Sequence, residues 1–208
     1  MQRKDNYAIT AEEARKRFLT NDLSKIISKT PLTQDEDYLY LPVLDRTCRI
    51  EKSTGKLAWS TPSGWMESAA FHDVLTIFDY LCDSKEVRCP TGEMKSMASF
   101  GKLFHTGLLE QSEPSELEKT IDKSPESFHF ACQKLGGTPF PTGDIAYTVH
   151  LFPDLPMTIQ FWHSDEDFPP QLCWLWDRAA GDFIRYETMF YALGILRSRL
   201  SFWIESYR

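Results

Sequence analysis

The sequence lacks the short motifs that mark the commonest catalytic sites. It contains no G-x-S-x-G nucleophile turn, no G-x-x-x-x-G-K-[ST] phosphate loop and no G-x-G-x-x-G dinucleotide fingerprint. It also contains no C-x-x-C pair, so no zinc ribbon or iron–sulfur cluster is encoded by a local motif. These absences disfavour the enzyme classes that depend on such motifs, and no motif identifies a cofactor.

Long apolar runs are also missing. No stretch approaches the roughly 20 apolar residues that a membrane-spanning helix needs. Residues 1–30 are charged and have no apolar segment of the kind found in a secretory signal peptide. The five cysteines are scattered and odd in number, and a free Cys behaves as a small hydrophobic residue. We therefore expect a cytoplasmic, reduced protein that does not enter a membrane.

Positive charge is in deficit, with 23 Lys and Arg against 30 Asp and Glu, a formal net charge of −7. An acidic chain gains nothing from the phosphates of nucleic acid, so we expect no nucleic-acid partner. The 208 residues, 42% of them hydrophobic, are enough for a substantial core. We expect one globular domain over residues 1–208, in which residues 1–62 could form a subregion.

Alternating apolar residues predict two groups of strands. The first group covers residues 38–44, 46–51 and 56–60, and its last two strands form a hairpin around a Ser-Thr-Gly turn. Pro42 indicates that the first of these strands lies at a sheet edge. The second group consists of a hairpin, "IAYTVHLF" and "MTIQFWH" around "PDLP", followed by a third antiparallel strand, "QLCWLWD".

Apolar residues three and four apart predict about four helices. Thr10 and Glu13 have capping-box spacing, which predicts a helix from residue 10 to about residue 29, broken near residues 21–22. The other three helices are predicted near residues 71–82, 125–136 and 187–205. Residues 84–127 give no clear pattern beyond a short strand and an acidic loop. The fold class is α+β, with antiparallel sheets built from two hairpins plus a C-terminal strand.

Residues 161–176, "FWHSDEDFPPQLCWLW", place an acidic loop between two apolar runs. In an extended segment His163, Asp165 and Asp167 share one face, and these residue types can bind a divalent metal. Asp165 and Glu166 are also candidate catalytic acids or bases. The spacing is not that of an EF-hand, because the Gly at position six and the distal Glu are absent. The alternative is a structural corner whose carboxylates accept backbone N–H groups.

Aromatic residues are concentrated around the same loop. The candidates for a pocket or a partner surface are Trp162, Phe168, Trp174 and Trp176, together with Asp177 at the end of the last strand. Trp174 and Trp176 share a strand face because side chains alternate along a strand. The alternative is that these rings form core, with their N–H groups satisfied at its edge.

The C-terminal half resembles the family called domain of unknown function 3786. The resemblance covers residues 75–185, and it rests on the stretches "LTIFDYLC" (75–82), "ACQKLGG" (131–137), "DIAYTVHLFPDLPMTIQFWHSDEDFPP" (144–170) and "WLWDRAAGDFI" (174–184). It implies a source among anaerobic bacteria or archaea. Some members carry an additional four-cysteine iron–sulfur domain, which implies an association with corrinoid or one-carbon metalloenzymes. This chain lacks that domain, and the resemblance transfers no catalytic residue.

Two functions follow as hypotheses. The first is a non-catalytic binding or accessory protein with a protein partner, and the family resemblance suggests an anaerobic metalloenzyme as that partner. The second is a metal-dependent or acid/base enzyme that acts on a small molecule through the acidic loop at residues 163–167, with Asp177 nearby. The second predicts a concave pocket that contains convergent polar groups. The substrate, the partner and the oligomeric state do not follow from the sequence.

Overall fold

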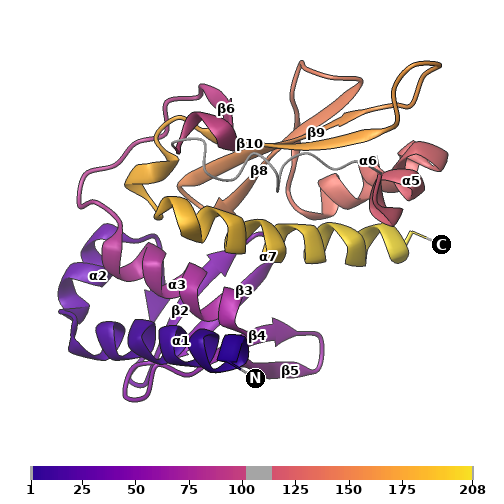
Figure 1. The fold of residues 1–208 in the computed structure, drawn as a ribbon. Helices are drawn as coiled ribbons and strands as arrows, with labels where there is room; N and C mark the ends of the chain where they lie inside the picture. The colour runs from indigo at the N-terminus through magenta and orange to yellow at the C-terminus, as the bar shows by residue number, and fades with distance from the viewer. Residues whose placement is uncertain (1, 102–113, 208) are drawn as a thin grey trace.

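A computed structural model describes residues 2–101 and 114–207 (Figure 1). Their fold is α+β, as the sequence predicts, with two antiparallel five-stranded sheets. The described helices are α1 (Gln2–Thr20), α2 (Leu23–Lys29), α3 (Phe71–Asp83), α5 (Glu116–Lys123), α6 (Pro125–Lys134) and α7 (Tyr186–Glu205), with short 3-10 turns at Met97–Ser99 and Ala180–Asp182. None of the helices in these residues is long and apolar enough to cross a bilayer.

The first sheet is a meander in the N-terminal half of the chain. Its strands lie in sequence order: β1 (Thr33–Gln34), β2 (Tyr38–Val43), β3 (Arg46–Glu51), β4 (Leu57–Thr61) and β5 (Gly64–Ser68). Side chains alternate along β2, so Leu39, Leu41 and Val43 are buried. β1 pairs only with Leu39 and Tyr40, which leaves Pro42 outside that ladder and explains how β2 accommodates a proline.

The second sheet is built from the C-terminal half and from one strand of the middle region. Its strands are β6 (Met94–Ser96), β7 (Thr138–Pro139), β8 (Ile145–Phe152), β9 (Leu155–Trp162) and β10 (Gln171–Asp177), in the spatial order β6-β10-β9-β8-β7. β9 is central, and every residue in it except Trp162 is buried. The predicted hairpin and the antiparallel C-terminal strand are thus confirmed.

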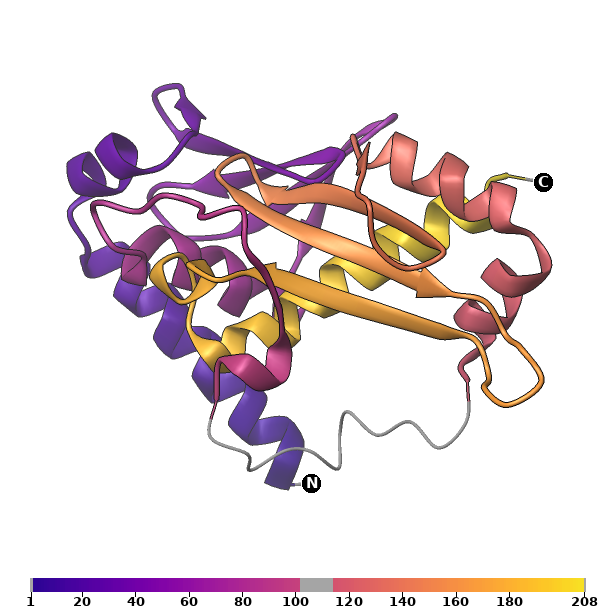
Figure 2. The same cartoon turned by 90° about the horizontal axis from the view of Figure 1, so that it is seen from above.

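Helix α7 lies between the two halves of the molecule and contacts α3 on one side and α6 on the other (Figures 1 and 2). Near its C-terminal end, Arg199 donates to Asp45 in the β2–β3 turn through Nε at 3.0 Å and Nη2 at 2.5 Å. Trp203 donates its indole N–H to the same carboxylate at 2.8 Å. The helix therefore fixes the first sheet to the C-terminal half.

Buried apolar side chains from both sheets form one contiguous cluster. Phe18 of α1 stacks on Phe78 of α3, with ring centroids 4.8 Å apart. Tyr80 of α3 stacks on Phe152 of β8 at 3.7 Å, which joins the two halves through their aromatic rings. The Leu44 N–H also donates to the Leu151 carbonyl, at 3.1 Å.

Two predictions about helices were wrong. Helix α1 begins at Gln2, not at Thr10, and the Thr10 hydroxyl donates to the Asn6 carbonyl within the helix at 2.9 Å. A local capping pattern cannot start a helix that already extends upstream of it. The acidic stretch expected as a loop contains α5, in which the Ser115 N–H donates to Glu118 at 2.6 Å. Residues 110–113 of the expected loop lie outside the described residues.

Candidate functional site

A charged cleft of about 460 Å³ lies between α1, α3 and α7. Helix α1 supplies Thr10, Glu13, Ala14 and Arg17, whose spacings of three and four residues place them on one helix face. The charged and aromatic side chains that line the cleft are Glu13, Arg17, Asp79, Arg185, Glu187 and Tyr191. Three segments that are far apart in the sequence therefore build one concave surface.

The base of the cleft contains a buried carboxylate from α3. Asp79 is 1% exposed, and Asp83 follows four residues later on the same face of α3. The Nε of Arg185 donates to Asp79 Oδ1 at 2.6 Å, and the Arg185 backbone N–H donates to Oδ2 at 2.8 Å. The carboxylate is thus bound by both the side chain and the backbone of one residue.

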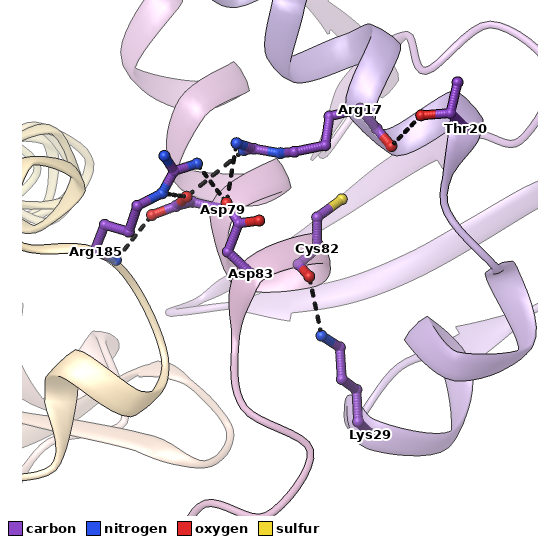
Figure 3. A network of polar contacts seen from close by, with 7 residues as sticks. All are labelled: Arg17, Thr20, Lys29, Asp79, Cys82, Asp83 and Arg185. Carbon is purple, nitrogen blue, oxygen red and sulfur yellow. Dashed lines mark hydrogen bonds and ion pairs between the residues drawn. The ribbon is translucent and has the colours of Figure 1, made fainter.

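Two arginines share the two carboxylates (Figure 3). Arg17 Nη1 lies 3.0 Å from Asp83 Oδ2, and Arg17 Nη2 lies 3.6 Å from Asp79 Oδ1. Arg185 Nη2 donates to Asp83. Each guanidinium therefore contacts both carboxylates, and the four side chains form a closed network that ties α1, α3 and the start of α7 together.

The two carboxyl groups have opposite pKa shifts. Burial alone would raise the pKa of Asp79, but the contact with Asp83 and the hydrogen bonds from Thr188 and Arg185 outweigh burial and lower that pKa. Burial raises the pKa of Asp83, and the neighbouring Asp79 raises it further, with Arg17 and Arg185 offsetting only part of the effect. Asp79 therefore keeps its charge to lower pH than Asp83, and Asp83 is the member that protonates first in acid.

A lysine caps the end of α3 beside this network. Lys29 Nζ donates to the carbonyl of Cys82 at 3.2 Å (Figure 3) and to the carbonyl of Ser84 at 2.8 Å. These carbonyls have no partner within the helix, and a cation also interacts favourably with the helix C-terminus. Burial raises the pKa of the Cys82 thiol, so Cys82 is not set up as a nucleophile.

A second cavity, of about 390 Å³, lies beside β10. It is lined by Cys173, Trp174 and Gln160 of the sheet and by Glu118 and Arg197 of the helices, among others. Glu118 is only 6% exposed, and it accepts the Leu172 backbone N–H at 3.1 Å. Of the aromatic residues proposed from the sequence, Trp174 lines this cavity.

The acidic loop joins β9 to β10, and its residues 164–168 are exposed. Asp165 Oδ1 accepts the backbone N–H groups of Asp167 at 2.9 Å and Phe168 at 2.7 Å. The Asp165 N–H in turn donates to the Phe168 carbonyl at 3.0 Å. In this structure the Asp165 carboxylate closes a turn, the arrangement that Asp commonly makes with the backbone that follows it.

The remaining loop residues point to different partners. His163 Nδ1 lies 2.9 Å from Asp122 at the end of α5, and the His163 N–H donates to Asp144 at 2.7 Å. The pKa of Asp122 is lowered, chiefly by a hydrogen bond from Ser164.

His163, Asp165 and Asp167 do not converge. Across the described residues, no group of three or more His, Cys, Asp or Glu side chains is arranged to hold a metal, and a metal or catalytic role for this loop stays a prediction.

The other candidates separate into surface and interior. Trp162 is 44% exposed and Phe168 is 65% exposed, whereas Trp176 and Asp177 are fully buried.

The Asp177 carboxylate accepts the N–H groups of Thr91, Gly92 and Ala179 at 2.7–3.0 Å. Burial opposes its ionisation, but these hydrogen bonds outweigh burial and lower the pKa of Asp177. Its contacts fix the 91–92 turn against the end of β10.

Reasoning from the sequence alone did not identify the charged cleft. One signal was present: Asp79 interrupts the apolar face of "LTIFDYLC", and a carboxylate among buried residues requires partners. The identity of those partners could not be read from the sequence, because Arg17 is 62 positions before Asp79 and Arg185 is 106 positions after it.

The family model described as Domain of unknown function (DUF3786) matches residues 22–199. The chain belongs to this family, and the match extends beyond the residues 75–185 that carry the resemblance in the sequence. It includes α3 and the start of α7, and thus Asp79, Asp83 and Arg185. Neither the curated proteins nor the solved structures contain a significant match to the chain.

Proposed function

We propose that the chain is a binding protein whose ligand occupies the cleft between α1, α3 and α7. The observation that carries this proposal is the network at the base of the cleft, in which Asp79 is held by Arg185 through two hydrogen bonds. A small-molecule site needs a concave surface with a few fixed polar groups. The cleft meets this description, since its charged groups are oriented before any ligand arrives.

The pKa shifts favour binding over acid–base chemistry at the base of the cleft. A general acid or base works best when its pKa lies near the operating pH. The pKa of Asp79 is instead lowered, and both arginines are engaged by carboxylates. Groups of this kind hold their charge over a wide pH range, which suits recognition of a ligand.

A thermal-shift screen tests the proposal. Fragment-sized cationic, neutral and anionic compounds are added to the wild type and to Thr10→Trp, which fills the rim of the cleft from an exposed position. At a ligand concentration of 100 Kd, binding contributes about 2.7 kcal/mol, which raises the Tm of a chain of this size by roughly 5–10 °C. We expect at least one compound whose shift is lost in Thr10→Trp and kept in Thr20→Trp, a matched variant on the same helix. If no compound of any charge class behaves in this way, the proposal is overturned.

The second candidate function is a metal-dependent or acid/base enzyme that uses the acidic loop, with His163, Asp165, Glu166 and Asp167 as ligands or bases. The observation that favours it is the His163–Asp122 pair, in which an imidazole of the loop is held 2.9 Å from a carboxylate. Element analysis of protein purified anaerobically without chelators tests it beside the triple replacement of residues 165–167 by Ala. Stoichiometric metal that is lost in the triple variant supports an enzyme site, and its absence from both proteins contradicts the metal-dependent form.

We also propose a cytoplasmic location and a protein partner in an anaerobic host. All five cysteines are free thiols, which supports a reducing compartment. The partner class, a corrinoid or one-carbon metalloenzyme, rests on what the family resemblance implies. Anaerobic affinity purification of the tagged chain from its native host tests this part, and recovery of the chain without a stoichiometric partner would contradict it.

A further inference from the structure

The charges in the cleft differ in how available they are. Arg17 and Arg185 each contact both Asp79 and Asp83, so these two positive and two negative charges balance. An anionic ligand would have to compete with Asp79, which is buried and fixed by two hydrogen bonds from Arg185. Removing a partner from a buried charge is costly. The arginines are therefore poor receptors for a second anion.

Two further carboxylates line the cleft without such partners. Glu13 comes from α1 and Glu187 from the first turn of α7, and both are exposed. Within the part of the chain that the structure describes, neither takes part in an ion pair. With the central network neutral, these two residues leave the cleft with an excess of two negative charges.

An aromatic ring forms part of the same surface. Tyr191 and Leu75 both line the cleft, and the Tyr191 ring packs edge-on against Phe71 at 4.9 Å between centroids. Phe71 in turn packs against Tyr7 at 4.5 Å. Burial raises the pKa of Tyr191, and Tyr7 and then Glu187 raise it further, so the Glu187 carboxylate lies within electrostatic reach of the ring. The ring face and the carboxylate both attract a cation.

We propose that the ligand of the cleft is an organic cation, a protonated amine or a guanidinium on a short apolar body. This inference rests on the proposed function, since it names the ligand of the same cleft. The charged group lies between the carboxylates of Glu13 and Glu187, and the apolar body lies against Tyr191 and Leu75. The balanced arginine–aspartate network forms the floor and holds the walls at a fixed distance.

Calorimetric titration with three probes of nearly equal shape tests the ligand class. The probes are phenethylamine, phenethyl alcohol and 3-phenylpropanoate, which are cationic, neutral and anionic at pH 7. We expect phenethylamine to bind tightest, with an affinity that falls as ionic strength rises. The double variant Glu13→Gln, Glu187→Gln is expected to bind it about three- to tenfold more weakly, since both carboxylates are solvent-exposed. The matched control Glu12→Gln, Glu205→Gln, on the same two helices outside the cleft, keeps the wild-type affinity.

The outcomes separate this inference from the proposed function. Tighter binding of the alcohol or the carboxylate, abolished by Thr10→Trp, would overturn the cationic ligand and leave the cleft as a binding site. Equal binding of phenethylamine by the wild type and the Glu13→Gln, Glu187→Gln variant would also overturn the inference. If no probe and no fragment binds in a manner that Thr10→Trp abolishes, both proposals fail.

Discussion

Arg185 and Asp79 are joined through two different groups of the arginine. The backbone N–H donates to one carboxylate oxygen at 2.8 Å, and Nε donates to the other at 2.6 Å. Arg185 is also the N-cap residue of α7, and its own side chain makes no cap to that helix. The carboxylate on α3 therefore fixes both the position and the direction in which α7 begins, and with it the wall of the cleft.

Replacing Asp79 by Asn is expected to lower the free energy of unfolding by about 2–4 kcal/mol, because two guanidinium groups lose a buried charged partner. Urea denaturation monitored by tryptophan fluorescence measures the change. Asp83→Asn is the matched control on the same helix face. Asp83 is more exposed, so its effect should be clearly smaller, and equal effects would contradict the central role of Asp79.

Asp177→Asn is expected to flatten the acid limb of the stability curve. The pKa of Asp177 is lowered in the folded state, so its contribution is complete above the unfolded value of about 3.9 and is lost as the pH falls through the lower folded value. Urea unfolding between pH 2 and pH 6 measures this (roughly the range in which Asp titrates). The wild type should lose more stability than the variant below about pH 4. Parallel curves of stability against pH would contradict this role of the Asp177 carboxylate.

The acidic loop offers a comparison between neighbours. Asp165→Ala is expected to cost about 0.5–2 kcal/mol, by analogy with the loss of a capping side chain, because the N–H groups of Asp167 and Phe168 lose their acceptor. Glu166→Ala, one residue away and exposed, should change stability by less than about 0.5 kcal/mol. Thermal unfolding of both variants measures the two losses of stability. A larger loss for Glu166→Ala would show that the carboxylates have other roles.

The five thiols should react in an order set by burial. Cys89 is exposed, Cys82 and Cys173 are partly buried, and Cys48 and Cys132 are buried. Burial strongly raises the pKa of Cys48 and Cys132, so little of the reactive thiolate forms in the native state. Titration with a chromogenic disulfide reagent should show one fast thiol that disappears in Cys89→Ser. Fast modification of Cys48 in the native protein would contradict the structure.

Strand alternation and helix periodicity were sufficient to predict most of the fold. The alternately buried Leu39, Leu41 and Val43 and the apolar face of α3 are patterns set by local geometry. Strand β5 was missed because its residues are mostly exposed, so it has no apolar alternation. The short strands β1 and β7 are two residues each and carry no periodic signal.

The cleft could not be predicted, because its chemistry depends on distance in space and not on spacing in sequence. Arg17, Asp79 and Arg185 are ordinary charged residues until the helices pack. The acidic loop was predicted as a candidate site for the opposite reason, since its carboxylates are adjacent in sequence. In the structure His163 turns to Asp122 while Asp165 turns to its own backbone. Proximity along the chain did not produce convergence in space.

Helix α7 has a mechanical consequence for both ends of the molecule. It is one continuous helix of 20 residues, about 30 Å long at 1.5 Å per residue. Its first turn carries Glu187 at the cleft, and its last turns carry Arg199 and Trp203, which hold Asp45 of the first sheet. A stiff rod anchored at both ends transmits a tilt at one end to the other. We therefore expect a tilt of the cleft wall to shift the β2–β3 turn as well.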